Sequence, residues 1–175
     1  NPWPEKDQIE RWREEDGVVY FSVTSDGTTG EEWIVRLEGK GFRLSSHYKH
    51  VLRSGGFKST DGVTTEVAVL KGSLFKDKDR NTRKIRAEAQ KRKLVKPNAE
   101  MACLIREKFT DEEIGAMGFW WVVVMHEPIE DTCGDSSLLH AGSENSRSLI
   151  AYIIDPFIRW ISNDGFAFTV SQARI

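Results

Sequence analysis

The feature that most constrains the fold is the apolar run at residues 119–125, which ends abruptly in His126, Glu127 and Pro128. Both alternating faces of this run are apolar, whereas a strand with one face in water alternates apolar and polar residues. β-branched and aromatic residues dominate it, which favours a strand over a short buried helix. The sequence therefore predicts a strand covered on both faces that delivers polar side chains to a loop at its end.

Residues 17–24, 63–71 and 166–170 have the same β-branched and aromatic character. With the run at residues 119–125 these make four predicted strands. Helical patterns separate the first three in chain order, at residues 17–24, 63–71 and 119–125, and such connections permit parallel pairing through right-handed crossovers. We therefore expect a mixed α and β fold, α+β or α/β, with one mixed sheet of about four or five strands and helices packed on it. Residues 1–175 would form a single globular domain.

Capping residues mark the expected helices. Helices are predicted at about residues 31–40, 45–54 and 80–94, and two short helices should follow before the central strand. Asn98 is predicted to cap the first of these short helices, and a capping box of Thr110 and Glu113 the second.

The loop before the first long helix contains two hydroxyl residues, Thr28 and Thr29. A functional interpretation makes them an anion-binding loop at a helix N-terminus. The alternative is a well-capped turn from strand to helix, because Glu31 and Glu32 follow at capping-box spacing and already complement the helix dipole. The loop also lacks the lysine of a P-loop.

Both ends of the chain have ambiguous patterns. Residues 1–16 predict a short N-terminal helical segment that docks on the core. Residues 148–155 fit either a helix or a strand. Residues 157–171 favour a β-hairpin that turns at the Asn-Asp-Gly sequence, although a helix from Pro156 competes with it.

Composition bounds the class of protein. The 175 residues are 39% hydrophobic and 30% charged, which is typical of a soluble globular protein. The sequence has no signal-peptide pattern and no apolar run long enough for a membrane span. Cys103 and Cys133 are too few for a disulfide framework, so reduced thiols in a cytoplasmic protein are expected.

Charge is distributed unevenly along the chain. Residues 76–96 hold ten Lys or Arg and three Asp or Glu, a net charge of +7. The remaining fifteen basic and twenty-four acidic residues give −9, so a near-neutral total of −2 conceals a basic segment on an acidic body. Such asymmetry indicates a polyanionic partner, although a solvated basic helix explains it too.

Nucleic acid is the first candidate partner. The predicted helix at residues 80–94 has only Ile85 and Ala89 as an inward pair, so most of it should face water. A helix-turn-helix motif does not fit, because its recognition helix comes second and this basic helix comes first. Phosphate contacts need only positive charge within reach. The predicted contacts are Arg80, Arg83, Lys84, Arg86, Lys91, Arg92 and Lys93.

A small hydrolase, with or without a bound metal ion, is a second hypothesis. The loop from His126 to Asp135 is rich in carboxylates and could supply His126 and Asp131 as metal ligands and Glu127 as a general base. If the first three strands were parallel, this loop would meet Thr28 and Thr29 at one sheet edge. The spacing matches no tight metal motif, and an ordinary polar turn explains the loop equally well.

A protein-interaction domain without catalysis is the third hypothesis. The chain has six Trp, and Trp3 and Trp12 lie outside the predicted strands, where one could be an exposed anchor. We rank polyanion binding first, protein interaction second and hydrolysis third. The sequence itself specifies no cofactor, substrate or oligomeric state.

Overall fold

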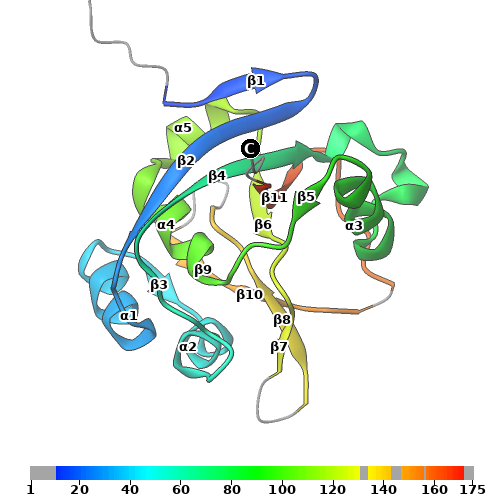
Figure 1. The fold of residues 1–175 in the computed structure, drawn as a ribbon. Helices are drawn as coiled ribbons and strands as arrows, with labels where there is room; N and C mark the ends of the chain where they lie inside the picture. The colour runs from blue at the N-terminus through cyan, green and yellow to red at the C-terminus, as the bar shows by residue number, and fades with distance from the viewer. Residues whose placement is uncertain (1–10, 131–133, 143–146, 156, 172–175) are drawn as a thin grey trace, which may run out of the picture.

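A six-stranded sheet forms the centre of the molecule (Figure 1). The structure is a computed structural model that describes residues 11–130, 134–142, 147–155 and 157–171. The strand order is β1–β2–β4–β11–β5, and β6 pairs with the same edge of β11 as β5 does, further towards the start of β11. These strands are β1 (Arg13–Glu15), β2 (Val18–Asp26), β4 (Asp61–Lys71), β5 (Leu94–Val95), β6 (Trp121–Val124) and β11 (Asp164–Val170).

The mixed α and β class is confirmed, but the sheet is larger than predicted and mostly antiparallel. Within the described part of this sheet, only β6 and β11 pair in parallel. The first two long strands, β2 and β4, are antiparallel, so the parallel pairing of the first three strands that the sequence permits does not occur. The physical reason lies at the end of β2, where Asp26 pairs with Asp61 at the start of β4. The intervening chain therefore returns to the same end of the sheet and makes no crossover.

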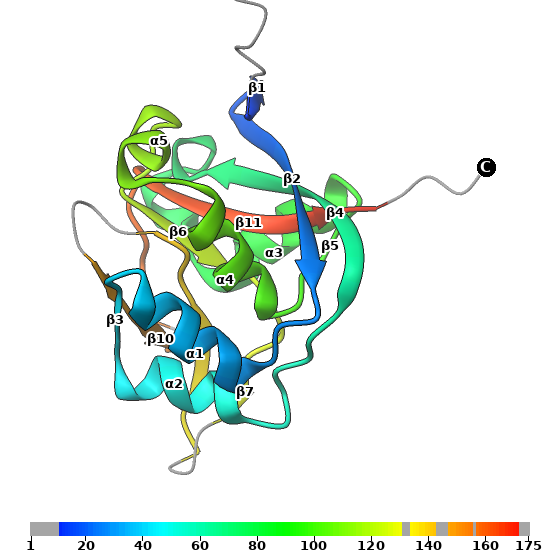
Figure 2. The same cartoon turned by 90° about the vertical axis from the view of Figure 1, so that its left-hand side faces the viewer.

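That intervening chain forms a helical layer beyond the end of β2. It contains α1 (Gly30–Gly39), β3 (Arg43–Leu44) and α2 (Ser46–Arg53), and Figure 2 shows α1 and α2 side by side below the sheet. Trp33, Ile34 and Leu37 of α1 are buried. The two helices bury their apolar faces against each other and against neighbouring elements.

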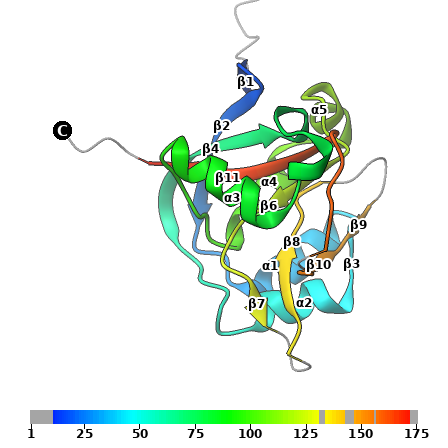
Figure 3. The same ribbon diagram turned by 90° about the vertical axis from the view of Figure 1, so that its right-hand side faces the viewer.

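Helices cover both faces of the sheet. On one side lie α4 (Glu100–Lys108) and α5 (Asp111–Ala116), and Figure 2 shows α4 in front of β11. On the other side lies α3 (Thr82–Lys91), which Figure 3 shows in front of the same strand. Two short 3-10 turns, η1 (Gly72–Leu74) and η2 (Asp77–Asp79), lead from β4 to α3. In the described residues no helix is long and apolar enough to span a membrane.

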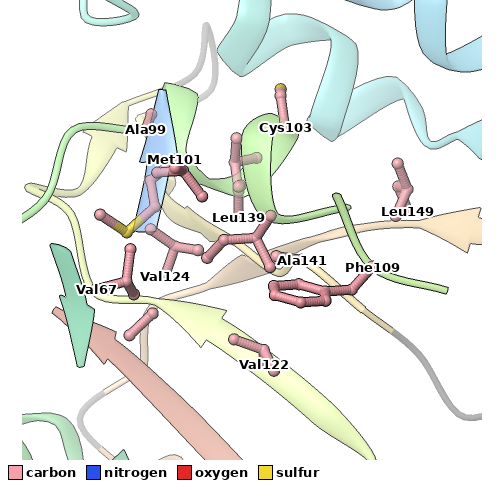
Figure 4. Close-up of a cluster of buried hydrophobic side chains, with 14 of the residues drawn as sticks. Val67, Ala99, Met101, Cys103, Phe109, Val122, Val124, Leu139, Ala141 and Leu149 are labelled. Atoms are coloured by element: carbon pink, nitrogen blue, oxygen red, sulfur yellow. The ribbon is translucent and has the colours of Figure 1, made fainter. Parts of the chain in front are cut away.

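The larger core cluster lies between the sheet and α4 (Figure 4). Val122 and Val124 of β6 point into it, and Met101 of α4 and the following Phe109 pack with them. The opposite faces of the same strands, including Val123, belong to a second cluster on the α3 side. Burial on both faces explains why the β6 sequence is a continuous apolar run, as predicted.

Capping residues place the helix ends largely as predicted. Thr29 with Glu32, and Thr110 with Glu113, form complete capping boxes. Asn81 caps α3, so this helix begins at Thr82 and ends at Lys91, inside the predicted limits. The prediction for Asn98 is wrong, because α4 has Ala99 at its N-cap position and no side-chain cap.

Two terminal predictions are wrong where the structure describes them. Residues 13–15 form β1, a strand paired with β2, because Asp16 and Gly17 adopt positive φ and make a tight turn; residues 1–10 lie outside the described part. The predicted hairpin is absent, since residues 157–163 form no strand and β11 alone is extended. The Trp160 backbone instead exchanges hydrogen bonds with Arg80, through its N–H and its carbonyl.

Two small sheets complete the fold. One has the order β10–β8–β7, and the other pairs β3 with β9 in parallel. The strands are β7 (Ile129–Glu130), β8 (Ser136–Leu139), β9 (Ser148–Leu149) and β10 (Ala151–Ile153). The ambiguous segment at residues 148–155 is therefore extended.

Candidate nucleic-acid interface

Helix α3 lies on the sheet through a narrow buried stripe. Ile85 and Ala89 are the buried residues of α3, as predicted, and they belong to the same cluster as Phe168 of β11. The rest of the helix is exposed or half-buried. A second stripe of α3 follows the i, i+3, i+4, i+7 spacing of one helix face and turns towards β5. It comprises Arg83, Arg86, Ala87 and Gln90.

A groove of about 730 Å³ runs between this second stripe and β5. We call it the α3–β5 groove. Its cationic lining residues are Arg83, Arg86 and Lys96, and no carboxylate lines it among the described residues. On the strand side, Leu94 and Val95 of β5 line it.

The floor of the groove is apolar. Phe168 shares its face of β11 with Phe166, and both pack on the α3 side of the sheet. Val170 lies two residues after Phe168 on β11, so its side chain is on the same face. Leu94 of β5 pairs with Val170, and its side chain therefore also points to the α3 side. Leu94 is half-buried and Phe168 is almost fully buried. The groove thus combines an apolar floor, formed by Leu94 and Phe168, with cations along its walls.

Arg86 is fixed in position at the groove wall. Its guanidinium donates hydrogen bonds to the carbonyl oxygens of Met125 and His126, each at 3.0 Å. Burial lowers its pKa from the usual value, but the guanidinium stays charged at neutral pH. Lys96, on the opposite wall, forms an exposed ion pair of 2.6 Å with Glu127. Exposed pairs of this kind are weak and exchange readily with other anions.

The remaining predicted phosphate contacts differ in their freedom. Lys84 pairs with Asp79 at 2.6 Å, and Arg92 pairs with Glu88 at 3.0 Å. Three more of the predicted contacts are exposed and form no ion pair within the described residues; they are Arg83, Lys91 and Lys93. Cations without carboxylate partners are the ones most available to a phosphate group.

Arg80 has a different role from its predicted neighbours. Its side chain is 8% exposed and donates hydrogen bonds to the carbonyls of Gly72, Phe75 and Trp160. It also pairs with Asp77. These contacts join the segment after β4 to the segment before β11. Arg80 therefore stabilises the fold and presents no free guanidinium edge to a phosphate.

Thr28 and Thr29 are already bonded to carboxylates. The Thr29 hydroxyl accepts a hydrogen bond from the Glu32 N–H at 3.2 Å, as an N-cap does. The Thr28 hydroxyl donates to Asp26 and accepts from Arg36 at 2.9 Å. Hydrogen bonds from Thr28 and Arg36 hold the pKa of Asp26 down to about 2. With acidic groups in these positions, an external anion meets negative charge at this loop.

His126 is buried, and its ring bonds to backbone groups of Leu139 and Glu127. Its Nε2 accepts a hydrogen bond from the Leu139 N–H at 3.0 Å, so its Nδ1 carries the proton and donates to the Glu127 carbonyl at 2.7 Å. Burial lowers its pKa to about 4. Both ring nitrogens are occupied, which leaves no lone pair for a metal ion. The Glu127 carboxylate is exposed and pairs with Lys96, and Asp131 lies outside the described residues.

The other predicted reactive or exposed groups do not assemble into a site. No three His, Cys, Asp or Glu side chains of the described residues gather closely enough to hold a metal ion. Cys103 is buried beside Tyr48, and burial raises its pKa to about 12, so it is not a reactive thiolate. Trp12 packs edge-on against Phe109 at 6.1 Å, whereas Trp3 and Cys133 lie outside the described residues.

Sequence reasoning missed the strand side of the groove. Leu94, Val95 and Lys96 were assigned to the end of the helix and the chain after it, yet two of them form β5. The available signal was the apolar pair Leu94-Val95 directly after the lysine-rich helix end, which is typical of a strand start. The second stripe on α3 was also visible as regular spacing of Arg83, Arg86 and Gln90.

No family model, no curated protein and no solved structure matches this chain.

Proposed function

We propose that the chain binds a phosphate-bearing polyanion, with nucleic acid as the first candidate, in the α3–β5 groove. The observation that supports this proposal is the lining of the groove, which has three cationic side chains and no carboxylate among the described residues. Because the whole chain carries −2, this separation of charge is not a consequence of a generally basic composition.

Two further cations are sequence neighbours of groove residues. Lys91 lies on α3 beside the groove residue Gln90, and Lys93 lies between α3 and β5. Together with the lining residues Arg83, Arg86 and Lys96 they are five cations in the groove or next to its lining in the chain. A backbone that places phosphates against all five would release a counterion at each contact.

The test is fluorescence anisotropy of a labelled, mixed-sequence oligonucleotide against protein concentration at several salt concentrations. With five phosphate contacts to a single strand, the log–log slope of affinity against salt should be about −3.5. In the variant Arg83→Gln/Lys91→Gln, the slope should become shallower by about 1.4, and affinity at low salt should fall roughly tenfold.

The matched control is Arg43→Gln/Lys58→Gln. These residues are exposed cations in the part of the molecule around α1 and α2, and the substitution removes the same charge. Figure 1 shows that part on the side opposite α3. The control should keep nearly the full slope. An equal loss in both variants would mean that affinity follows net charge alone, and the proposal would be wrong.

A further inference from the structure

We infer that the polyanion taken by the α3–β5 groove is a single-stranded nucleic acid, whose bases lie on the apolar floor while its phosphates contact the cations of the walls. This inference rests on the proposed function and narrows its ligand class. It follows from three features of the groove: its shape, its floor and the direction in which α3 presents its cations.

The shape excludes a duplex from the groove itself. A helix that reads a duplex enters the major groove and needs its cations on a convex, outward surface. Arg83 and Arg86 instead belong to the stripe of α3 that faces β5, so they line a hollow. A hollow of about 730 Å³ has the size of a small-molecule site, which suits one or two unpaired nucleotides and not a double helix.

Only unpaired bases can place their apolar faces against the floor of the groove. In a duplex the apolar faces of the bases are stacked inside, and phosphates and sugars face the protein. In a single strand those faces are exposed and gain free energy from contact with apolar side chains. The half-buried Leu94 and the 46% exposed Val95 line the groove and offer such contact. The exposed amide of Gln90 also lines the groove, as a hydrogen-bond donor and acceptor for base edges.

The positive charge of the groove walls disfavours an uncharged ligand. An apolar peptide would supply no anion for Arg83, which forms no ion pair within the described residues, whereas a nucleotide chain supplies a phosphate for each step along the groove. Poly-glutamate would compensate the charge but has no flat apolar group for the floor. It is therefore the competing ligand in the experiment below.

The first arm compares one labelled single strand with the duplex it forms with its complement, at matched salt. The single strand should bind roughly tenfold tighter, since base contacts add to the phosphate contacts. Equal affinity for both forms would overturn the inference and leave the proposed function standing. Absence of binding by either form at low salt would overturn both. Poly-glutamate of matched charge that competes as well as the single strand would assign the groove to acidic polypeptides and overturn the inference.

The second arm adds an aromatic ring to the groove wall. In Gln90→Tyr the ring can stack on a base without any change of charge. Affinity for the single strand should rise about fivefold at every salt concentration, with an unchanged slope, and affinity for the duplex should not change. Val35→Tyr is the control, because Val35 is 69% exposed on α1, outside the groove. Equal gains in both variants, or no gain in Gln90→Tyr, would contradict placement of bases in this groove.

Discussion

At the scale of single residues, burial decides which polar side chains are structural, and the local sequence does not reveal whether a polar side chain is buried. Arg80 and Arg83 stand three positions apart in one basic run, yet Arg80 is bonded to backbone carbonyls and Arg83 lines the groove. His126 at the end of the apolar run was a reasonable site candidate. The structure places its ring in the core because Leu139 of β8 lies beside it, and no local pattern encodes that contact.

The two buried histidines predict a specific loss of stability in acid. Burial lowers the pKa of both His126 and His140 from 6.5 to about 4. Because these bases protonate more readily in the unfolded chain, the folded state loses stability as pH falls from 6.5 towards 4. At pH 5 each histidine should cost about 2 kcal/mol relative to neutral pH.

Urea unfolding of the wild type and His126→Gln at pH 7 and pH 5 checks this prediction. The wild type should lose about 2 kcal/mol more than the variant over this interval. The quantity to compare is the change in unfolding free energy from pH 7 to pH 5, taken for the wild type and for the variant. This comparison cancels the effect of Asp164, whose pKa burial raises to about 6. That carboxyl destabilises the folded state as pH rises through 6, so it opposes the histidines. Parallel pH curves would refute a buried neutral His126.

At the scale of elements, local patterns predict an element wherever its own sequence contains the signal, such as a capping box or a continuous apolar run. The capping boxes of α1 and α5 and the doubly buried strand β6 were predicted from such patterns. The strand order was not, since pairing between β4 and β11 joins residues about a hundred positions apart. Strand β1 was missed although Asp16-Gly17 is a hairpin signature, because the polar residues before it also suit a helix.

The end of α3 gives a prediction in which stability and binding change in opposite directions. Lys93 follows the helix cap and has φ of 60°, a conformation that favours glycine. Lys93→Gly should therefore stabilise the fold by about 1 kcal/mol in urea unfolding. It should also make the salt slope for a single strand shallower by about 0.7, because one phosphate contact is lost.

Asp16→Gly is the matched control for Lys93→Gly. Asp16 has φ of 51° in the β1–β2 turn, so the same backbone strain is relieved far from α3 in the chain. This variant should gain similar stability and keep the wild-type slope. If Lys93→Gly gained stability and also kept the full slope, Lys93 would not contact the ligand.

At the scale of the whole molecule, the sheet separates two different surroundings. On its α4 side a large apolar cluster joins the helices to β6 and β8 (Figure 4). On its α3 side a smaller cluster anchors one basic helix, whose outer stripes stay at the surface. The charge asymmetry seen in the sequence becomes a spatial one, because the +7 segment folds into α3, β5 and the turns before them.

The most direct test of ligand binding in the α3–β5 groove is a titration of ¹⁵N-labelled protein with an unlabelled single-stranded oligonucleotide, followed by amide chemical shifts. The groove account predicts saturable shifts at the amides of α3, from Arg83 to Lys91, and of Leu94 to Lys96. Amides of α1 and α2 should remain unchanged. Saturable shifts centred on α1 and α2, or no shifts at low salt, would contradict the assignment of the groove as the binding site.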